Sequence, residues 1–220
     1  MMVKTVYCIC GLGSDERIFS KLRWKDADVH YLHWLMPLEK ESLTDYALRM
    51  SEKVTEKEST LIGVSFGGIM SIEIAKLTGI QKVVLISSVK THNEVPLWLR
   101  TMGKLSVESL IPQGRFHHIR PLKLFAPVQN YFLGAVTDEE KRLAHEYRKN
   151  VDTHYLKWSI HQILNWKNEW LPEKLFHLHG KKDKLFPHRL VNPTHSIEAA
   201  GHFLIYQHPQ QVSNILNVII

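Results

Sequence analysis

The sequence predicts an α/β fold, in which a mostly parallel sheet of about six strands carries helices on both faces and a helical insertion. Three observations lead to this prediction. Short apolar segments rich in β-branched residues alternate with helical patterns along most of the 220 residues. Glycines and polar residues gather directly after these segments. Residues 89–171, by contrast, show helical patterns and no clear strand.

Composition indicates a soluble globular protein. Hydrophobic residues make up 44% of the chain and charged residues 23%, so residues 1–220 are expected to form one domain with an inserted helical cap at 89–171. The formal charge is +6, but the basic residues are scattered, so no nucleic-acid partner is expected, while a mild preference for negatively charged substrates stays open. No apolar run is long enough to span a bilayer, and Val3–Cys10 is too short for a signal peptide. We therefore expect a cytoplasmic protein, of undetermined oligomeric state.

The first half of the chain begins the alternation. Lys4–Cys10 is expected to be a strand, and Gly11-Leu12-Gly13-Ser14 ends it as a loop. A short helix is expected at Glu16–Leu22, followed by a second strand at Asp28–Trp34. A serine or threonine cap then opens a helix over residues 42–53.

The two cysteines lie in the first predicted strand. Cys8 and Cys10 share a face of that strand but cannot easily bond to each other, and no second cysteine pair is present to complete a metal site. They are expected to be buried core thiols, and neither a metal nor a cofactor is expected.

A serine between glycines dominates the middle of the chain. Gly63-Val64-Ser65-Phe66-Gly67 follows the apolar run Thr60–Val64 and precedes a helical pattern that Gly79 ends. Strand, sharp turn and helix are the context of a nucleophile elbow, in which a strained turn exposes the serine hydroxyl. The alternative is a tight turn with a structural serine.

Regular alternation continues after the elbow and resumes after the cap. Gln81–Ser88 is expected to be a buried strand. Within the cap, helices are expected at Val136–Asn150 and Thr153–Trp166. The remaining predicted elements are strands at Lys174–His179 and Thr194–Glu198, a helix or turn at His188–Val191, and a final helix at Pro209–Val218.

Two polar residues follow the last two predicted strands. A serine nucleophile needs a base within hydrogen-bond reach and an acid that orients the base. Asp183 follows the penultimate strand, and His202 follows the last one after Ala200-Gly201. Because ligands collect at the carboxyl ends of parallel strands, both side chains are expected near Ser65. Alternatively, Asp183 is a surface turn residue among lysines.

The chain order Ser65, Asp183, His202 resembles that of the α/β-hydrolases, and the resemblance covers nearly the whole chain outside the cap. It implies that Ser65 is the nucleophile, His202 the general base and acid, and Asp183 the orienting carboxylate. It also implies an oxyanion hole made by the backbone N–H groups of Leu12 and Phe66. Cys10-Gly11 stands where relatives commonly have His-Gly, which is a departure from the family pattern.

Aromatic residues are the candidates for a substrate pocket. Phe203 and the ring of Phe66 adjoin the proposed catalytic atoms in sequence. Trp98 and Trp158 in the cap either line an acyl pocket or hold the cap to the body.

The expected function is therefore a serine hydrolase that cleaves a small-molecule carboxylic ester or thioester through an acyl-enzyme. Alternatives are a non-catalytic receptor on the same scaffold, an acyltransferase, or a carbon–carbon bond hydrolase. His177-x-His179 with Asp183 also allows a zinc-hydrolase interpretation, but the spacing to Asp183 is too long for the compact ligand cluster of such enzymes.

Overall fold

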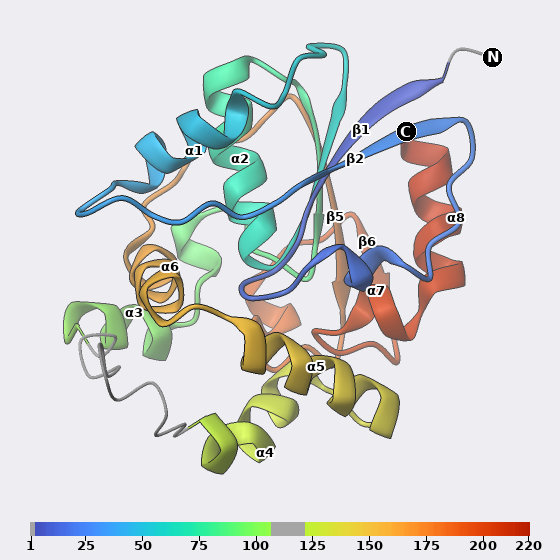
Figure 1. Cartoon of the computed structure of the whole chain (residues 1–220). Coiled ribbons are helices and arrows are strands. Elements are labelled where there is room, and N and C mark those ends of the chain that lie inside the picture. Colours follow the sequence, from blue (N-terminus) through green and yellow to red (C-terminus); the bar gives the residue numbers. More distant parts are fainter. Residues whose placement is uncertain (1–2, 107–121) are drawn as a thin grey trace.

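The computed structural model describes residues 3–106 and 122–220, and their strands form one parallel sheet (Figure 1). The strands are β1 (Lys4–Ile9), β2 (Ala27–Leu32), β3 (Thr60–Val64), β4 (Lys82–Ile86), β5 (Lys174–Gly180) and β6 (His195–Ile197). Their order across the six-stranded sheet is β2-β1-β3-β4-β5-β6, and every neighbouring pair is parallel. The predicted α/β class and the predicted number of strands are confirmed.

Helices cover both faces of this sheet. The α-helices are α1 (Leu43–Ser51), α2 (Phe66–Thr78), α3 (Leu97–Lys104), α4 (Leu122–Leu133), α5 (Asp138–Asn150), α6 (Thr153–Asn165), α7 (Leu204–Gln207) and α8 (Pro209–Ile219). Short 3₁₀ turns are η1 (Glu16–Phe19), η2 (His92–Glu94) and η5 (His188–Leu190). Figure 1 shows α1 and α2 on one side of the sheet and α8 on the other, with α4 and α5 across one edge.

Alternation along the buried strands divides the interior into two cores. On β1, Tyr7 and Ile9 belong to the core under α1 and α2, whereas Val6 and Cys8 belong to the core under η1 and α8. Cys8 and Cys10 are both buried and free of disulfides. Burial raises the pKa of the Cys10 thiol to about 12, so this thiol stays neutral at physiological pH.

Some elements differ from the sequence-based expectation. The helix expected at Glu16–Leu22 is only the 3₁₀ turn η1, which Asp15 caps and whose Ile18 and Phe19 enter the core. Helices α3, α4 and α7 were not predicted. Helix α4 contains Pro127, which interrupts the usual helical signal, and α7 has four residues, too few for a periodic pattern.

The name cap is kept for residues 89–171, the insertion expected from the sequence, of which 107–121 lie outside the described residues. Its described part contains η2 and α3–α6 and no strand. Two indole N–H groups join it to the body: Trp158 donates to the Glu41 carbonyl oxygen and Trp166 to Glu73 Oε1, both at 2.8 Å. Nowhere in the described parts of the chain is a helix both long and apolar enough to cross a bilayer.

Candidate active site

Ser65, Asp183 and His202 follow the carboxyl ends of three strands. Ser65 comes directly after β3, Asp183 three residues after β5, and His202 five residues after β6. The loop at residues 10–14 follows β1, the neighbour of β3. Because all strands are parallel, these segments meet at one edge of the sheet.

Ser65 occupies a sharp turn between β3 and α2. Its φ of 53° and ψ of −118° lie in a region that non-glycine residues seldom adopt. Its N–H donates to the Ile86 carbonyl oxygen at 2.9 Å, and Ser88 Oγ donates to the Ser65 carbonyl oxygen at 2.7 Å. These two bonds to β4 and to the segment after it hold the strained turn in place.

The two glycines of the motif allow the backbones around Ser65 to approach closely. A Cβ on Gly63 would collide with the main chain of Gly67. A Cβ on Gly67 would collide with the carbonyl groups of Ile9 and Cys10. The turn therefore forms only with glycine at both positions.

A chain of hydrogen bonds links the three polar residues. Ser65 Oγ lies 2.9 Å from His202 Nε2, and His202 Nδ1 lies 2.8 Å from Asp183 Oδ2. An ionised carboxylate only accepts, so the proton of the neutral imidazole belongs on Nδ1. His202 Nε2 is then free to accept the proton of the Ser65 hydroxyl.

The carboxylate of Asp183 is buried and well supported. Its Oδ1 accepts hydrogen bonds from the N–H groups of Leu185 and Phe186, both at 2.9 Å, while Oδ2 faces His202. Asp183 is 4% exposed and His202 5% exposed. A buried carboxylate that backbone N–H groups hold in place is suited to orient an imidazole. The alternative in which Asp183 is a surface turn residue is wrong, because its side chain is buried.

Two further histidines lie behind Asp183. His179 Nε2 lies 2.7 Å from the Phe186 carbonyl oxygen and 3.5 Å from Asp183 Oδ2. Because a carbonyl only accepts, His179 carries its proton on Nε2, and its Nδ1 accepts from His177 Nε2 at 3.2 Å. Burial lowers the pKa of both histidines, so both are neutral. Among the described residues, no group of three or more His, Cys, Asp or Glu side chains is arranged to hold a metal ion.

The predicted oxyanion donors, the N–H groups of Phe66 and Leu12, belong to two segments that meet at Ser65. The N–H of Phe66 is the first of α2, where helix N–H groups have no intrahelical acceptor. Leu12 follows Gly11, on which a Cβ would lie 3.5 Å from Ser65 Cβ. Within the described part of the chain, neither N–H group has an acceptor. The geometry leaves both donors available beside Ser65.

A cavity of about 500 Å³ opens at Ser65 and His202. The loop after β1 and the segments after β5 and β6 form its walls on the body side, and α3, α4, α5 and α6 of the cap form walls on the other side. Most of its lining is apolar, including Leu99, Met102, Val128, Phe132, Leu133, Val151, Leu156, Ile160, Ile163, Leu185 and Phe186. Such a cavity can hold a substrate of moderate size.

Two of the four predicted pocket side chains line this cavity. Trp98 and Phe203 do so. The pocket role expected for Trp158 is wrong and its alternative role of holding the cap to the body is confirmed, because its ring lies against that of Tyr46 with 4.3 Å between ring centroids, in the core between the cap and α1. The Phe66 ring is also outside the cavity, and it stacks on Trp34 with 5.0 Å between ring centroids.

Sequence reasoning missed most of the cavity lining in the cap. The lining residues Ala144, Tyr147 and Arg148 of α5, with the C-cap residue Val151, recur in the sequence at helical spacing. This stripe is visible in the sequence, but only the packing shows that it faces Ser65 rather than another helix. Leu185 and Phe186 could have been found from the sequence, because these two apolar residues follow Asp183 by only two and three positions.

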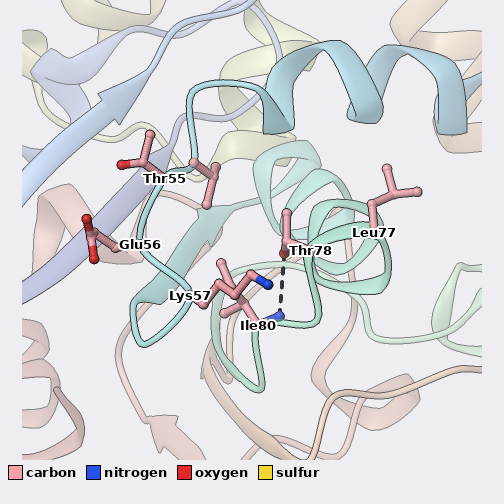
Figure 2. Close-up of a pocket in the computed structure, with 7 residues that line it drawn as sticks. Thr55, Glu56, Lys57, Leu77, Thr78 and Ile80 are labelled. Carbon is pink, nitrogen blue, oxygen red and sulfur yellow. Dashed lines mark hydrogen bonds between the residues drawn. The ribbon is translucent and has the colours of Figure 1, made fainter.

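A second hollow, of about 230 Å³, lies before β3 begins, at the opposite edge of the sheet, and Figure 2 shows the residues that line it. The seven residues that line it come from the segment before β3 and from the end of α2. They include Glu56 and Lys57 but no histidine, and Thr78 Oγ1 accepts from the Ile80 N–H at 3.4 Å. No hydroxyl and base are paired there.

Among the comparisons with known proteins, the one with solved structures identifies the fold. No family model matches the chain, and no curated protein matches it in sequence. Solved structures that are similar include a hydrolase from Oleispira antarctica, with TM-score 0.70 and 17% identity over 97% of this chain and 89% of that one. An esterase from Thermogutta terrifontis has TM-score 0.66 and 13% identity, over 99% and 89%. A type II thioesterase from yersiniabactin biosynthesis has TM-score 0.62 and 13% identity, over 99% and 93%. The chain therefore has the α/β-hydrolase fold that its sequence resembles.

Proposed function

We propose that this protein is a serine hydrolase that cleaves a carboxylic ester or thioester through an acyl-enzyme. One observation carries the proposal: the hydrogen-bonded series Ser65, His202, Asp183 ends at a largely apolar cavity. The fold shared with a hydrolase, an esterase and a thioesterase supports the reaction class.

In the first half of the reaction, Ser65 Oγ attacks the carbonyl carbon of the substrate while its proton passes to His202 Nε2. Asp183 stabilises the imidazolium that forms. The N–H groups of Leu12 and Phe66 donate to the oxyanion, an interaction worth about 3 kcal/mol per donor in comparable sites. The intermediate collapses, His202 returns its proton to the departing alcohol or thiol, and the acyl group stays on Ser65.

In the second half, His202 removes a proton from water, which attacks the acyl-enzyme carbonyl. As the second tetrahedral intermediate collapses, His202 returns this proton to Ser65 Oγ, which releases a carboxylic acid and restores the Ser65 hydroxyl. The receptor alternative is less favoured, because a ligand-binding scaffold has no need of the strained backbone that exposes Ser65.

A fluorophosphonate probe tests the nucleophile. The probe is expected to label Ser65 of the wild type, located by mass mapping, and not to label Ser65→Ala or His202→Ala. Both variants are expected to lose about 10³-fold or more of the kcat for p-nitrophenyl butyrate and for an acyl thioester, because the triad acts as a unit.

Ser20→Ala and His208→Ala serve as matched controls, since both residues lie outside the cavity lining. They are expected to keep labelling and turnover, and thermal unfolding verifies that each variant is folded. A folded wild type that the probe leaves unlabelled, or labels at another residue, would contradict the proposal. Stoichiometric ester binding without turnover would favour the receptor.

A further inference from the structure

Among the described residues that line the cavity beside Ser65, Arg148 on α5 has the one permanently charged side chain. Its Nη1 donates to the Asn130 side-chain oxygen at 2.9 Å, which joins α5 to α4. No ion pair among the described residues includes Arg148, and no Asp or Glu is part of the described cavity lining. The guanidinium therefore has more donors than its single neutral partner can accept.

Helical geometry directs Arg148 into the cavity. Ala144, Tyr147 and Arg148 occupy positions i, i+3 and i+4 of one stripe on α5, and Val151 is the C-cap residue that follows the helix; all four line the cavity. Val151 lies against Gly13, since a Cβ there would be 3.2 Å from Val151 Cγ2. Arg148 precedes Val151 by about one helical turn, or about 5 Å along the helix axis. It therefore lies close to the point where Val151 contacts the loop beside Ser65.

The electrostatic environment of Arg148 differs from that of the paired arginines. The hydrogen bonds that Arg17 donates to Asp15 and Arg49 donates to Glu41 raise the pKa of each arginine. Burial lowers the pKa of Arg148, although a guanidinium stays charged at physiological pH. Arg148 is partly buried and has no counter-ion among the residues that the structure describes. It has therefore lost part of its hydration, which an entering anion would replace.

Two more polar groups of the cavity lining lack partners. The Tyr147 hydroxyl and Gln129 Oε1 are buried, and neither has a hydrogen bond within the described residues. Burial raises the pKa of Tyr147, so its hydroxyl keeps the proton that it can donate. Tyr147 precedes Arg148 on α5, and Gln129 precedes Asn130, which holds Arg148. Both groups line the same cavity as Arg148 and add hydrogen-bonding capacity to its largely apolar wall.

We propose that Arg148 binds a carboxylate of the substrate, so that the preferred substrates are esters or thioesters bearing a second, ionised carboxyl group. The planar fork of a guanidinium matches a carboxylate in two parallel hydrogen bonds. This inference rests on the proposed serine hydrolase function for its effect on turnover, but carboxylate binding can be measured without turnover.

The test compares matched esters that differ in one charge. The carboxylate is placed on the acyl side in mono-p-nitrophenyl glutarate, against p-nitrophenyl pentanoate. It is placed on the leaving group in 3-carboxy-4-nitrophenyl butyrate, against p-nitrophenyl butyrate. The ratio of kcat/KM for the charged over the neutral ester is expected to fall about tenfold or more in Arg148→Met in one of the two pairs. The pair that responds identifies which side of the scissile bond carries the carboxylate.

Arg142→Met is the matched control, because Arg142 is an exposed arginine on the same helix outside the cavity lining. It removes the same charge and is expected to keep both ratios. Arg148→Lys keeps the charge without the fork and is expected to lose an intermediate part of the ratio. Ratios that are equal in wild type and Arg148→Met for both pairs would overturn the inference while leaving the hydrolase proposal intact.

A wild type that turns over none of the esters would contradict the hydrolase proposal instead. Calorimetry then tests Arg148 alone, with glutarate as the probe. Glutarate is expected to bind about tenfold more weakly to Arg148→Met than to wild type or Arg142→Met. Equal binding to all three proteins would overturn the carboxylate site.

Discussion

At the scale of single residues, the environment of Ser65 shows how a small motif is constrained from all sides. The serine has a left-handed φ, and its main chain is held by bonds to Ile86 and Ser88. The glycines on either side are needed for packing as well as for the turn, because neighbouring main chain occupies the space of their missing Cβ atoms. Gly63 is thus part of β3, Ser65 is hydrogen-bonded to β4 and the segment after it, and Gly67 packs against the end of β1.

Replacement of two glycines beside Ser65 is expected to have very different effects. In Gly67→Ala the new Cβ meets the carbonyl groups of Ile9 and Cys10, which belong to the backbone and cannot rotate away. In Gly11→Ala the nearest atoms are 3.4–3.5 Å away, an ordinary contact distance. Urea unfolding is expected to show a loss of about 3 kcal/mol or more for Gly67→Ala and about 1 kcal/mol or less for Gly11→Ala. Similar losses in both variants would contradict this packing argument.

At the scale of elements, the cap is attached to the body through α6 and the turn that follows it. Trp158 on α6 donates to the Glu41 carbonyl, and Trp166 at the end of α6 donates to Glu73 on α2. On the other side of the cap, the N–H of Phe203 donates to the Leu133 carbonyl oxygen at 3.0 Å. The residue next to His202 is thus bonded to the end of α4, so the cap supports the catalytic loop as well as the cavity.

The bond between Trp166 and Glu73 gives a measurable contribution to stability. Glu73 is buried, and its Oε1 also pairs with Lys76 at 2.6 Å. Trp166→Phe removes one donor from this carboxylate and is expected to lower the free energy of unfolding by about 1–3 kcal/mol. Trp170→Phe is the control, because Trp170 is 40% exposed. Equal stability of the two variants in urea would show that the indole bond is not what holds this end of the cap.

At the scale of the whole molecule, two buried neutral histidines make stability depend on pH. Burial lowers the pKa of His177 and His179 in the folded state below the value of about 6.5 in an unfolded chain. Below pH 6.5 the unfolded chain binds protons that the folded protein does not. Stability is therefore complete above about pH 6.5 and falls as the pH decreases from there toward the folded-state values.

Urea unfolding between pH 7.5 and 5 measures this dependence. His177→Gln removes one of the two groups and is expected to make the free energy of unfolding fall less steeply with decreasing pH than in wild type. His145→Gln removes an exposed histidine and is expected to keep the wild-type slope. The slope is compared rather than the absolute stability, so a general destabilisation by the substitution does not affect the result. Identical slopes in all three proteins would contradict the assignment.

Most of the sheet and three of the candidate site residues could be predicted from the chain alone. Strands such as Thr60–Val64 and Lys82–Ile86 are continuous apolar runs, because both faces of a central parallel strand are buried. Ser65, Asp183 and His202 could be found because parallel strands place their carboxyl ends at one edge, so the position after a strand predicts proximity in space.

Only the tertiary structure decided what surrounds that edge. A tryptophan on a helix either lines a cavity or packs into a core, and Trp98 and Trp158 differ in this respect although both lie in the cap. Likewise, the place of Arg148 in the cavity depends on how α5 is rotated against the sheet. Strand ends meet by the local rule of parallel pairing, whereas the direction of a cap side chain depends on long-range packing that sequence spacing does not determine.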